Sequence, residues 1–173
     1  DRTMRWDGSG YGSHAETSVG SPSTVWYLAE GATHSGFDLF YLIQNPSETT
    51  AQVQVTYLLP APAAPVVKTY AVAANSRSTI WVDLEGPQLA ATDVSATVVS
   101  SNAVPIIVER AMYLNAGGLL FGAGHESAGV TSTGTNWFLA EGATGPYFDE
   151  FVLIANPTAT TAQVRATYLL PGG

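Results

Sequence analysis

Apolar and polar residues alternate along several short stretches of this chain. Within residues 51–59, AQVQVTYLL, the apolar side chains of Val53, Val55 and Tyr57 occupy every second position, and polar residues separate them. A period of two residues is typical of a strand with one buried face. Comparable stretches lie at residues 24–30, 38–44, 65–73, 77–83, 93–100 and 104–114, separated by turn-forming Pro, Gly, Asn and Ser. Seven short strands therefore predict an all-β fold, an Ig-like antiparallel β-sandwich.

Parts of this pattern occur twice. WYLAEGAT at residues 26–33 returns as WFLAEGAT at 137–144, and TTAQVQVTYLLP at 49–60 returns as TTAQVRATYLLP at 160–171. Both matches have a spacing of 111 residues. A fixed long period is typical of proteins built from tandem modules. We therefore predict a repeated module with about seven strands.

The match also extends upstream of the first strand. His14 corresponds to His125 at the same spacing, and DRTM at residues 1–4 corresponds to ERAM at 109–112 at a spacing of 108. The chain is therefore expected to hold the end of one module, a whole module and the beginning of another.

These correspondences predict four segments. Residues 1–23 are the last strand of a preceding module plus a linker, and residues 24–114 are a complete Ig-like module. Residues 115–135 are a linker rich in Gly, Ser and Thr, and residues 136–173 are the first half of a following module. Because the linker includes an apolar LLF sequence, we expect it to dock on a module.

The two end segments are expected to need partners. Three strands of a seven-strand sandwich leave apolar faces and open edges. We expect either a neighbouring copy that adds strands or further chain to complete them, and both readings place the module in an extended array.

Composition narrows the classes of partner. Fourteen acidic residues against six basic ones give a formal net charge of −8. Nucleic acids and anionic membranes attract basic surfaces, so neither is an expected partner. No apolar run approaches the ~20 residues that span a bilayer. The absence of cysteine excludes disulfides and Cys-based metal sites.

The order of the motifs resembles a known kind of protein. WYLAEGAT, IQNP, AQVQVTYLLP, ANSRSTIWV and PIIVERAMY follow one another as in an uncharacterised family of tandem Ig-like repeats. Members of that family occur in large secreted or surface-anchored bacterial proteins. The resemblance covers nearly the whole chain and implies the same fold and an extracellular or cell-surface location. It implies no particular biochemical activity.

Glu30 and Arg110 are candidates for a structural ion pair. Arg110 shares one strand face with Val108, so its guanidinium is expected inside the module. An unpaired buried charge is very costly, and a carboxylate suits the planar guanidinium. Glu30 ends the first strand, and the partial copies hold Glu141 and Arg2 at the equivalent positions. We therefore predict that Glu30 clamps the first strand to the last.

Trp81 is the candidate for an interaction surface. Ile80 and Val82 alternate inward, so Trp81 is expected on the outer face. An exposed Trp can stack on a sugar ring or pack against a neighbouring protomer, unless a loop of its own module covers it. A second aromatic in one exposed platform would favour the sugar.

Carboxylates near turns are the candidates for calcium. Asp38 and Asp149 each follow a Phe where a loop meets a strand, and Glu150 follows Asp149. Together with Asp83 or Glu85 they could supply oxygen ligands, but no D-x-D-x-D-G loop is present. Asp at such junctions usually accepts hydrogen bonds from turn amides, so we expect no cofactor and keep calcium as the alternative.

The histidines and serines do not predict catalysis. His14 and His125 are expected in loops after the RTM and RAM strands, and His34 has Gly145 as its counterpart. A metal at His14 or His125 is the lesser alternative to a solvated histidine, because the neighbouring Glu is not at the same position in the two copies. Neither a G-x-S-x-G elbow nor a phosphate-binding Gly loop occurs. We therefore expect no enzyme.

The Asn-Pro pairs predict matching turns. Asn45-Pro46 and Asn156-Pro157 should end their strands in the same way, with Pro ending the ladder. Each is followed by Ser or Thr, but Pro in the middle position excludes an N-glycosylation sequon.

Together these features indicate a structural or interaction repeat of an extracellular bacterial surface or filament-forming protein. Its module would act as a β-sandwich spacer without catalysis, and the alternative is a carbohydrate-binding or adhesin module. The expected partners are neighbouring copies or adjacent repeats of the same protein, with a glycan as the other possibility.

Overall fold

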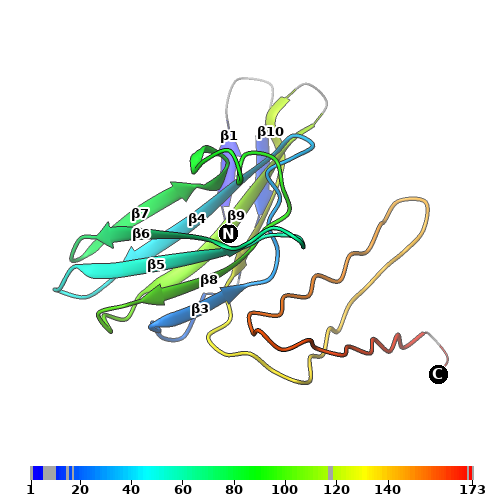
Figure 1. Ribbon diagram of the computed structural model, residues 1–173. Coiled ribbons are helices and arrows are strands. Elements are labelled where there is room, and N and C mark those ends of the chain that lie inside the picture. The colour runs from blue at the N-terminus through cyan, green and yellow to red at the C-terminus, as the bar shows by residue number, and fades with distance from the viewer. Residues whose placement is uncertain are drawn as a thin grey trace.

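The computed structural model describes residues 2–5, 11–14, 16, 18–116, 119–170 and 172 (Figure 1). Eight strands form two antiparallel four-stranded sheets that pack face to face. One sheet contains, in spatial order, β3 (Val25–Leu28), β8 (Ser95–Ser100), β5 (Ala51–Leu58) and β6 (Val66–Val72). The other contains β10 (Leu119–Ala128), β9 (Ile107–Ala116), β4 (Phe37–Asn45) and β7 (Ser76–Trp81).

The predicted all-β sandwich is confirmed. A short 3-10 helix, η1 (Val82–Leu84), follows β7. The described residues contain no α-helix, and hence none long and apolar enough to cross a membrane. Two sheets of four strands differ from the four-plus-three order of an immunoglobulin constant domain. The Ig-like description therefore stays a prediction beyond the two-sheet architecture.

Buried and exposed side chains alternate along β5, and the buried ones form part of the core between the two sheets. Val53, Val55 and Tyr57 are at most 1% exposed, whereas Gln52 and Gln54 face solvent. β5 is central in its sheet, with β6 on one side and β8 on the other. Burial of one face and full hydrogen bonding of both edges account for its regularity. The facing sheet contributes the buried side chains of Leu39, Tyr41, Ile43, Ile80 and Val108.

The prediction of a linker over residues 115–135 was wrong for residues 119–128, and β9 also extends into it as far as Ala116. Residues 119–128 form β10, which pairs with β9 and closes one edge of the second sheet. Gly124 looked like a linker residue in the sequence, but it lies under the ring of Tyr113, where an added Cβ would come within 2.8 Å of that ring. Glycine is required there by close approach, not by flexibility. The expected seven-strand module therefore has eight strands.

A second correction concerns the N-terminal segment. β1 (Arg2–Arg5) pairs with β2 (Tyr11–His14) in a hairpin, where a single strand and a linker were expected. Because Arg2 and His14 correspond in sequence to Arg110 and His125, this hairpin is the counterpart of β9–β10, although Arg2 pairs with His14 whereas Arg110 pairs with Ser127. β2 lies alongside β10 (Figure 1).

Residues 137–170 form no strand, although they repeat residues 26–59 (Figure 1). Trp137 is 59% exposed, whereas its counterpart Trp26 is 1% exposed. The topology gives the reason. β3 pairs with β8, β4 with β7 and β9, and β5 with β6 and β8, so none of these three strands pairs with another of the three. The repeated segment carries three strand sequences that cannot make a sheet among themselves.

Candidate functional site

The outer face of the β10-β9-β4-β7 sheet carries a row of aromatic side chains. Phe40 of β4 lies opposite Trp81 of β7, with ring centroids 5.2 Å apart. Tyr113 of β9 lies 5.7 Å from Phe40, and Phe121 of β10 lies 5.0 Å from Tyr113. We call Trp81, Phe40, Tyr113 and Phe121 the aromatic row. Trp81 lies on the outer face of the sheet, since its neighbour Ile80 points to the opposite face and is buried.

The geometry of the aromatic row decides what it can bind. Trp81 is 39% exposed, but Tyr113 is only 6% exposed. The planes of neighbouring rings cross at 37°, 62° and 42°, so the rings tilt against one another. A sugar chain stacks best on coplanar open faces, whereas tilted and edge-on rings are typical of packed apolar surfaces. The row therefore suits a protein neighbour better than a glycan.

The structure brings Glu30 and Arg110 together. Arg110, in β9, is 3% exposed, and its Nη1 donates to the carboxylate of Glu30. The same nitrogen lies 3.4 Å from the main-chain oxygen of Glu30. The Glu30 side chain is 31% exposed, so it is much less buried than Arg110. Water therefore screens one side of an otherwise buried pair.

His125 completes this cluster, and sequence reasoning missed it. Its Nδ1 accepts a hydrogen bond from Nη2 of Arg110, which places the predicted loop histidine on β10 beside the guanidinium. Tyr41 is the cross-strand neighbour of Arg110 and is fully buried. Burial raises the pKa of the Tyr41 hydroxyl, so it stays neutral. The recurrence of His14 with Arg2 was the available signal.

The repeated AEGAT motif has a structural explanation beyond Glu30. The main-chain oxygen of Gly31 accepts a hydrogen bond from Val94 N–H at 2.9 Å, and three hydrogen bonds join Thr33 and Thr92. An added Cβ at Gly31 would lie 2.6 Å from Leu39 Cδ2 and 2.9 Å from the main-chain oxygen of Val94. The motif therefore fastens the end of β3 to the loop that precedes β8.

Replacing Gly31 by alanine should lower the free energy of unfolding by about 2 kcal/mol, because a main-chain oxygen cannot move away as a side chain can. Gly20→Ala is the matched control, since an added Cβ there meets no atom within 4 Å. Urea unfolding followed by circular dichroism compares the two. Equal midpoints would contradict the close packing at Gly31.

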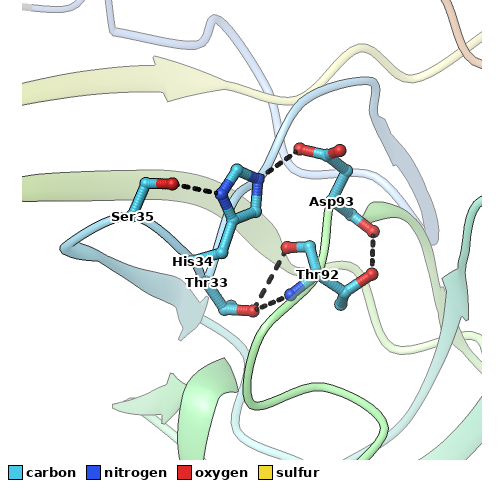
Figure 2. A network of polar contacts seen from close by, with 5 residues as sticks. All are labelled: Thr33, His34, Ser35, Thr92 and Asp93. Atoms are coloured by element: carbon cyan, nitrogen blue, oxygen red, sulfur yellow. Dashed lines mark hydrogen bonds and ion pairs between the residues drawn. The ribbon is translucent and has the colours of Figure 1, made fainter.

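Figure 2 shows a second polar network at the same end of the sandwich. His34 Nε2 lies 2.9 Å from Asp93 Oδ1, and His34 Nδ1 lies 2.8 Å from Ser35 Oγ. The residue types are those of a hydrolase triad, but the His34 and Asp93 side chains are 41% and 71% exposed. Water competes for each of these bonds, and a triad depends on a buried, oriented carboxylate. The contacts tie two loops together.

A third network joins β5, β6 and the segment after η1. Lys68 Nζ and the Tyr70 hydroxyl each donate to Glu85 Oε2 at 2.8 Å, and the hydroxyls of Tyr57 and Tyr70 are 2.9 Å apart. Burial pushes the pKa of Glu85 up, but the bonds from Lys68 and Tyr70 outweigh burial and lower it overall. A lowered folded-state pKa stabilises the fold above the unfolded pKa, and that stability is lost as pH falls through the folded pKa.

Glu85→Gln should therefore cost about 1 kcal/mol at pH 7 and little near pH 3. The exposed Glu48→Gln is the control and should change stability little at either pH. Thermal unfolding at several pH values measures both. A Glu85→Gln cost that does not shrink on acidification would show that the carboxylate charge contributes nothing.

The calcium candidates are engaged in other contacts or lie apart. Asp38 Oδ2 accepts from Asn115 Nδ2 at 3.0 Å, and Asp83 Oδ2 accepts from Leu39 N–H at 2.9 Å. Burial and, to a smaller extent, the charge of Asp38 raise the pKa of Asp83. Asp149 and Glu150 lie in the exposed segment without strands. Within the described ranges, no three His, Asp or Glu side chains group as a metal site would.

The Asn-Pro turns are built alike in both copies. Asn45 Nδ2 donates to Thr49 O at 2.9 Å, and its Oδ1 accepts from Ser47 N–H at 3.0 Å. Asn156 makes the equivalent bonds to Thr160 O at 2.7 Å and Thr158 N–H at 3.1 Å. The turn therefore forms from local sequence even where its strands have no partners.

Comparisons with known proteins support the fold and go no further. Neither the protein-family models nor the curated proteins contain a match to this chain. A solved structure described as Thermotoga maritima 1070 is similar with a TM-score of 0.56 and 17% identity, over 66% of this chain and 98% of that one. The Anabaena sensory rhodopsin transducer is similar with a TM-score of 0.45 and 23% identity, over 54% of this chain and 91% of that one. At these identities the first similarity concerns the fold alone, and the second is too distant to support an argument.

Proposed function

We propose that this chain is part of a tandem β-sandwich repeat in an extracellular or cell-surface bacterial protein, whose modules act as spacers without catalysis. One observation carries the proposal. Residues 137–170 repeat the sequences of β3, β4 and β5 at a constant spacing, and in the complete module those three strands pair only with β6, β7, β8 and β9. Such a segment can pair its three strands only within another module of the same kind.

The partners in this proposal are adjacent repeats or neighbouring copies. The buried centre of a protein–protein interface is more apolar than the free surface, and aromatic side chains are enriched in it. The aromatic row, with Trp81 39% exposed, is the surface in the described part of the module that best fits such a neighbour.

Labelling of intact cells tests the proposed location. An antibody against residues 19–130 should label cells that make the protein without permeabilisation, and added protease should remove the label. Labelling that appears only after lysis would contradict the extracellular assignment.

A carbohydrate-binding or adhesin module is the second candidate, because Trp81 does lie beside another aromatic, Phe40. A glycan array and calorimetry with the native chain and Trp81→Ala distinguish the two. We expect no glycan affinity that depends on Trp81. Micromolar binding that Trp81→Ala abolishes would favour the carbohydrate-binding function over the spacer.

A further inference from the structure

Val130 is held by the complete module through its backbone. Tyr27 N–H donates to Val130 O at 2.8 Å, and Val130 N–H donates to Tyr27 O at 3.0 Å. Just before it, Gly129 N–H donates to Val108 O at 3.2 Å. After β10 ends, the chain thus runs from a position beside β9 in one sheet to a position beside β3 in the other. There it covers the edge of β3. The Val130 side chain remains 42% exposed.

The equivalent residue of the preceding repeat contacts the module that follows it, and it does so through its side chain. Val19 corresponds to Val130 at the spacing of 111 residues. Its side chain packs against the core cluster of the module that follows it. Four residues later, Ser23 forms two backbone hydrogen bonds of 2.9 Å with Ile106. The segment before β3 therefore already belongs to the following module.

We propose that this valine position is shared by two consecutive modules. Its backbone closes the β3 edge of one module, as Val130 does, and its side chain packs against the core of the next, as Val19 does. The partner of the exposed Val130 side chain is thus the next repeat of the same chain. This inference rests on the tandem function proposed above.

The shared valine leaves almost no free linker between modules. Residue 130 is fixed to one module, and Ser23, whose counterpart is residue 134, is fixed to the other. The hairpin β1–β2, the counterpart of β9–β10 in the preceding repeat, also lies against β10. Consecutive modules are therefore in direct contact and hold a fixed angle, unlike beads on flexible linkers of about 20 residues.

The test uses a completed chain, which we define as residues 1–171 with Glu150→Leu, continued by residues 61–128. Pro171 corresponds to Pro60, so the added residues supply β6–β10 to the second copy in register. Glu150 is changed because its counterpart Leu39 is 0% exposed. Val130→Ser is compared with Val67→Ser, a control at a valine that is 54% exposed.

Amide exchange and NMR relaxation give the readouts. Val130→Ser should speed exchange at residues 131–136 by about tenfold or more, the effect of losing one buried valine, and should let the two modules tumble independently. Val67→Ser should do neither. If Val130→Ser behaves like Val67→Ser while residues 137–170 are protected, the shared valine is wrong and the tandem function stands. If residues 137–170 remain unprotected in the completed chain, both proposals fail.

Discussion

Replacing Arg110 by alanine is expected to lower the free energy of unfolding by about 3 kcal/mol. The guanidinium is 3% exposed and donates both to the carboxylate of Glu30 and to His125. Its removal leaves a partly buried carboxylate without this partner and opens a cavity beside β9, where the side chain was buried. Because Glu30 keeps 31% of its exposure, water regains part of the lost interaction and the cost stays near the low end for buried pairs.

Arg77→Ala is the matched control for this prediction. Arg77 is exposed on β7 and donates to Thr79 Oγ1 at 3.1 Å, so its loss should cost less than about 0.5 kcal/mol. Urea unfolding followed by near-ultraviolet circular dichroism measures both variants, with Glu30→Gln and the double variant completing a cycle. An Arg110→Ala cost as small as that of Arg77→Ala would show that the pair does not clamp the module.

Asn45→Ala should destabilise the module by a similar amount, about 3 kcal/mol. Asn45 is 0% exposed, and its Nδ2 lies within 3.0 Å of the main-chain oxygens of Thr49, Val72 and Ala73. Alanine leaves these acceptors without that donor inside the protein, where water cannot replace it. The side chain ties the end of β4 to the end of β6, in the opposite sheet, so the ends of both strands should loosen.

The repeat provides the control for Asn45. Asn156 makes the same local bond, to Thr160 O, but lies in the exposed segment. Asn156→Ala should therefore leave the unfolding midpoint of the native chain unchanged within about 0.5 kcal/mol. Comparable losses for both variants would mean that the local turn, and not its burial, determines the stability.

Features with a regular period or an obligatory partner could be predicted from the sequence. The alternation in residues 51–59 identified β5 because a buried face requires apolar residues at every second position. The Glu30–Arg110 contact followed from the inward position of Arg110, since a buried charge needs a carboxylate. Trp81 was placed outward by the same alternation.

Features that depend on contact between distant segments could not be predicted. β10 was assigned to a linker because glycine is depleted in strands, and only the ring of Tyr113 over Gly124 explains why glycine is needed. The role of His125 depends on that strand, so it was missed as well. The exposure of residues 137–170 follows from the order of strands in the sheets, which no local pattern encodes.

The central claim is that residues 137–170 carry the first three strands of a second module, and that these strands pair only with equivalents of β6, β7, β8 and β9. Amide hydrogen exchange, resolved by mass spectrometry, tests it directly in the native chain and in the completed chain defined above. In the native chain these amides should exchange rapidly, because this segment forms no strand in the described structure. In the completed chain they should become protected to the same extent as residues 26–59, and the indole of Trp137 should become buried as that of Trp26 is. Exchange at residues 137–170 that remains equally rapid in both chains would contradict the claim.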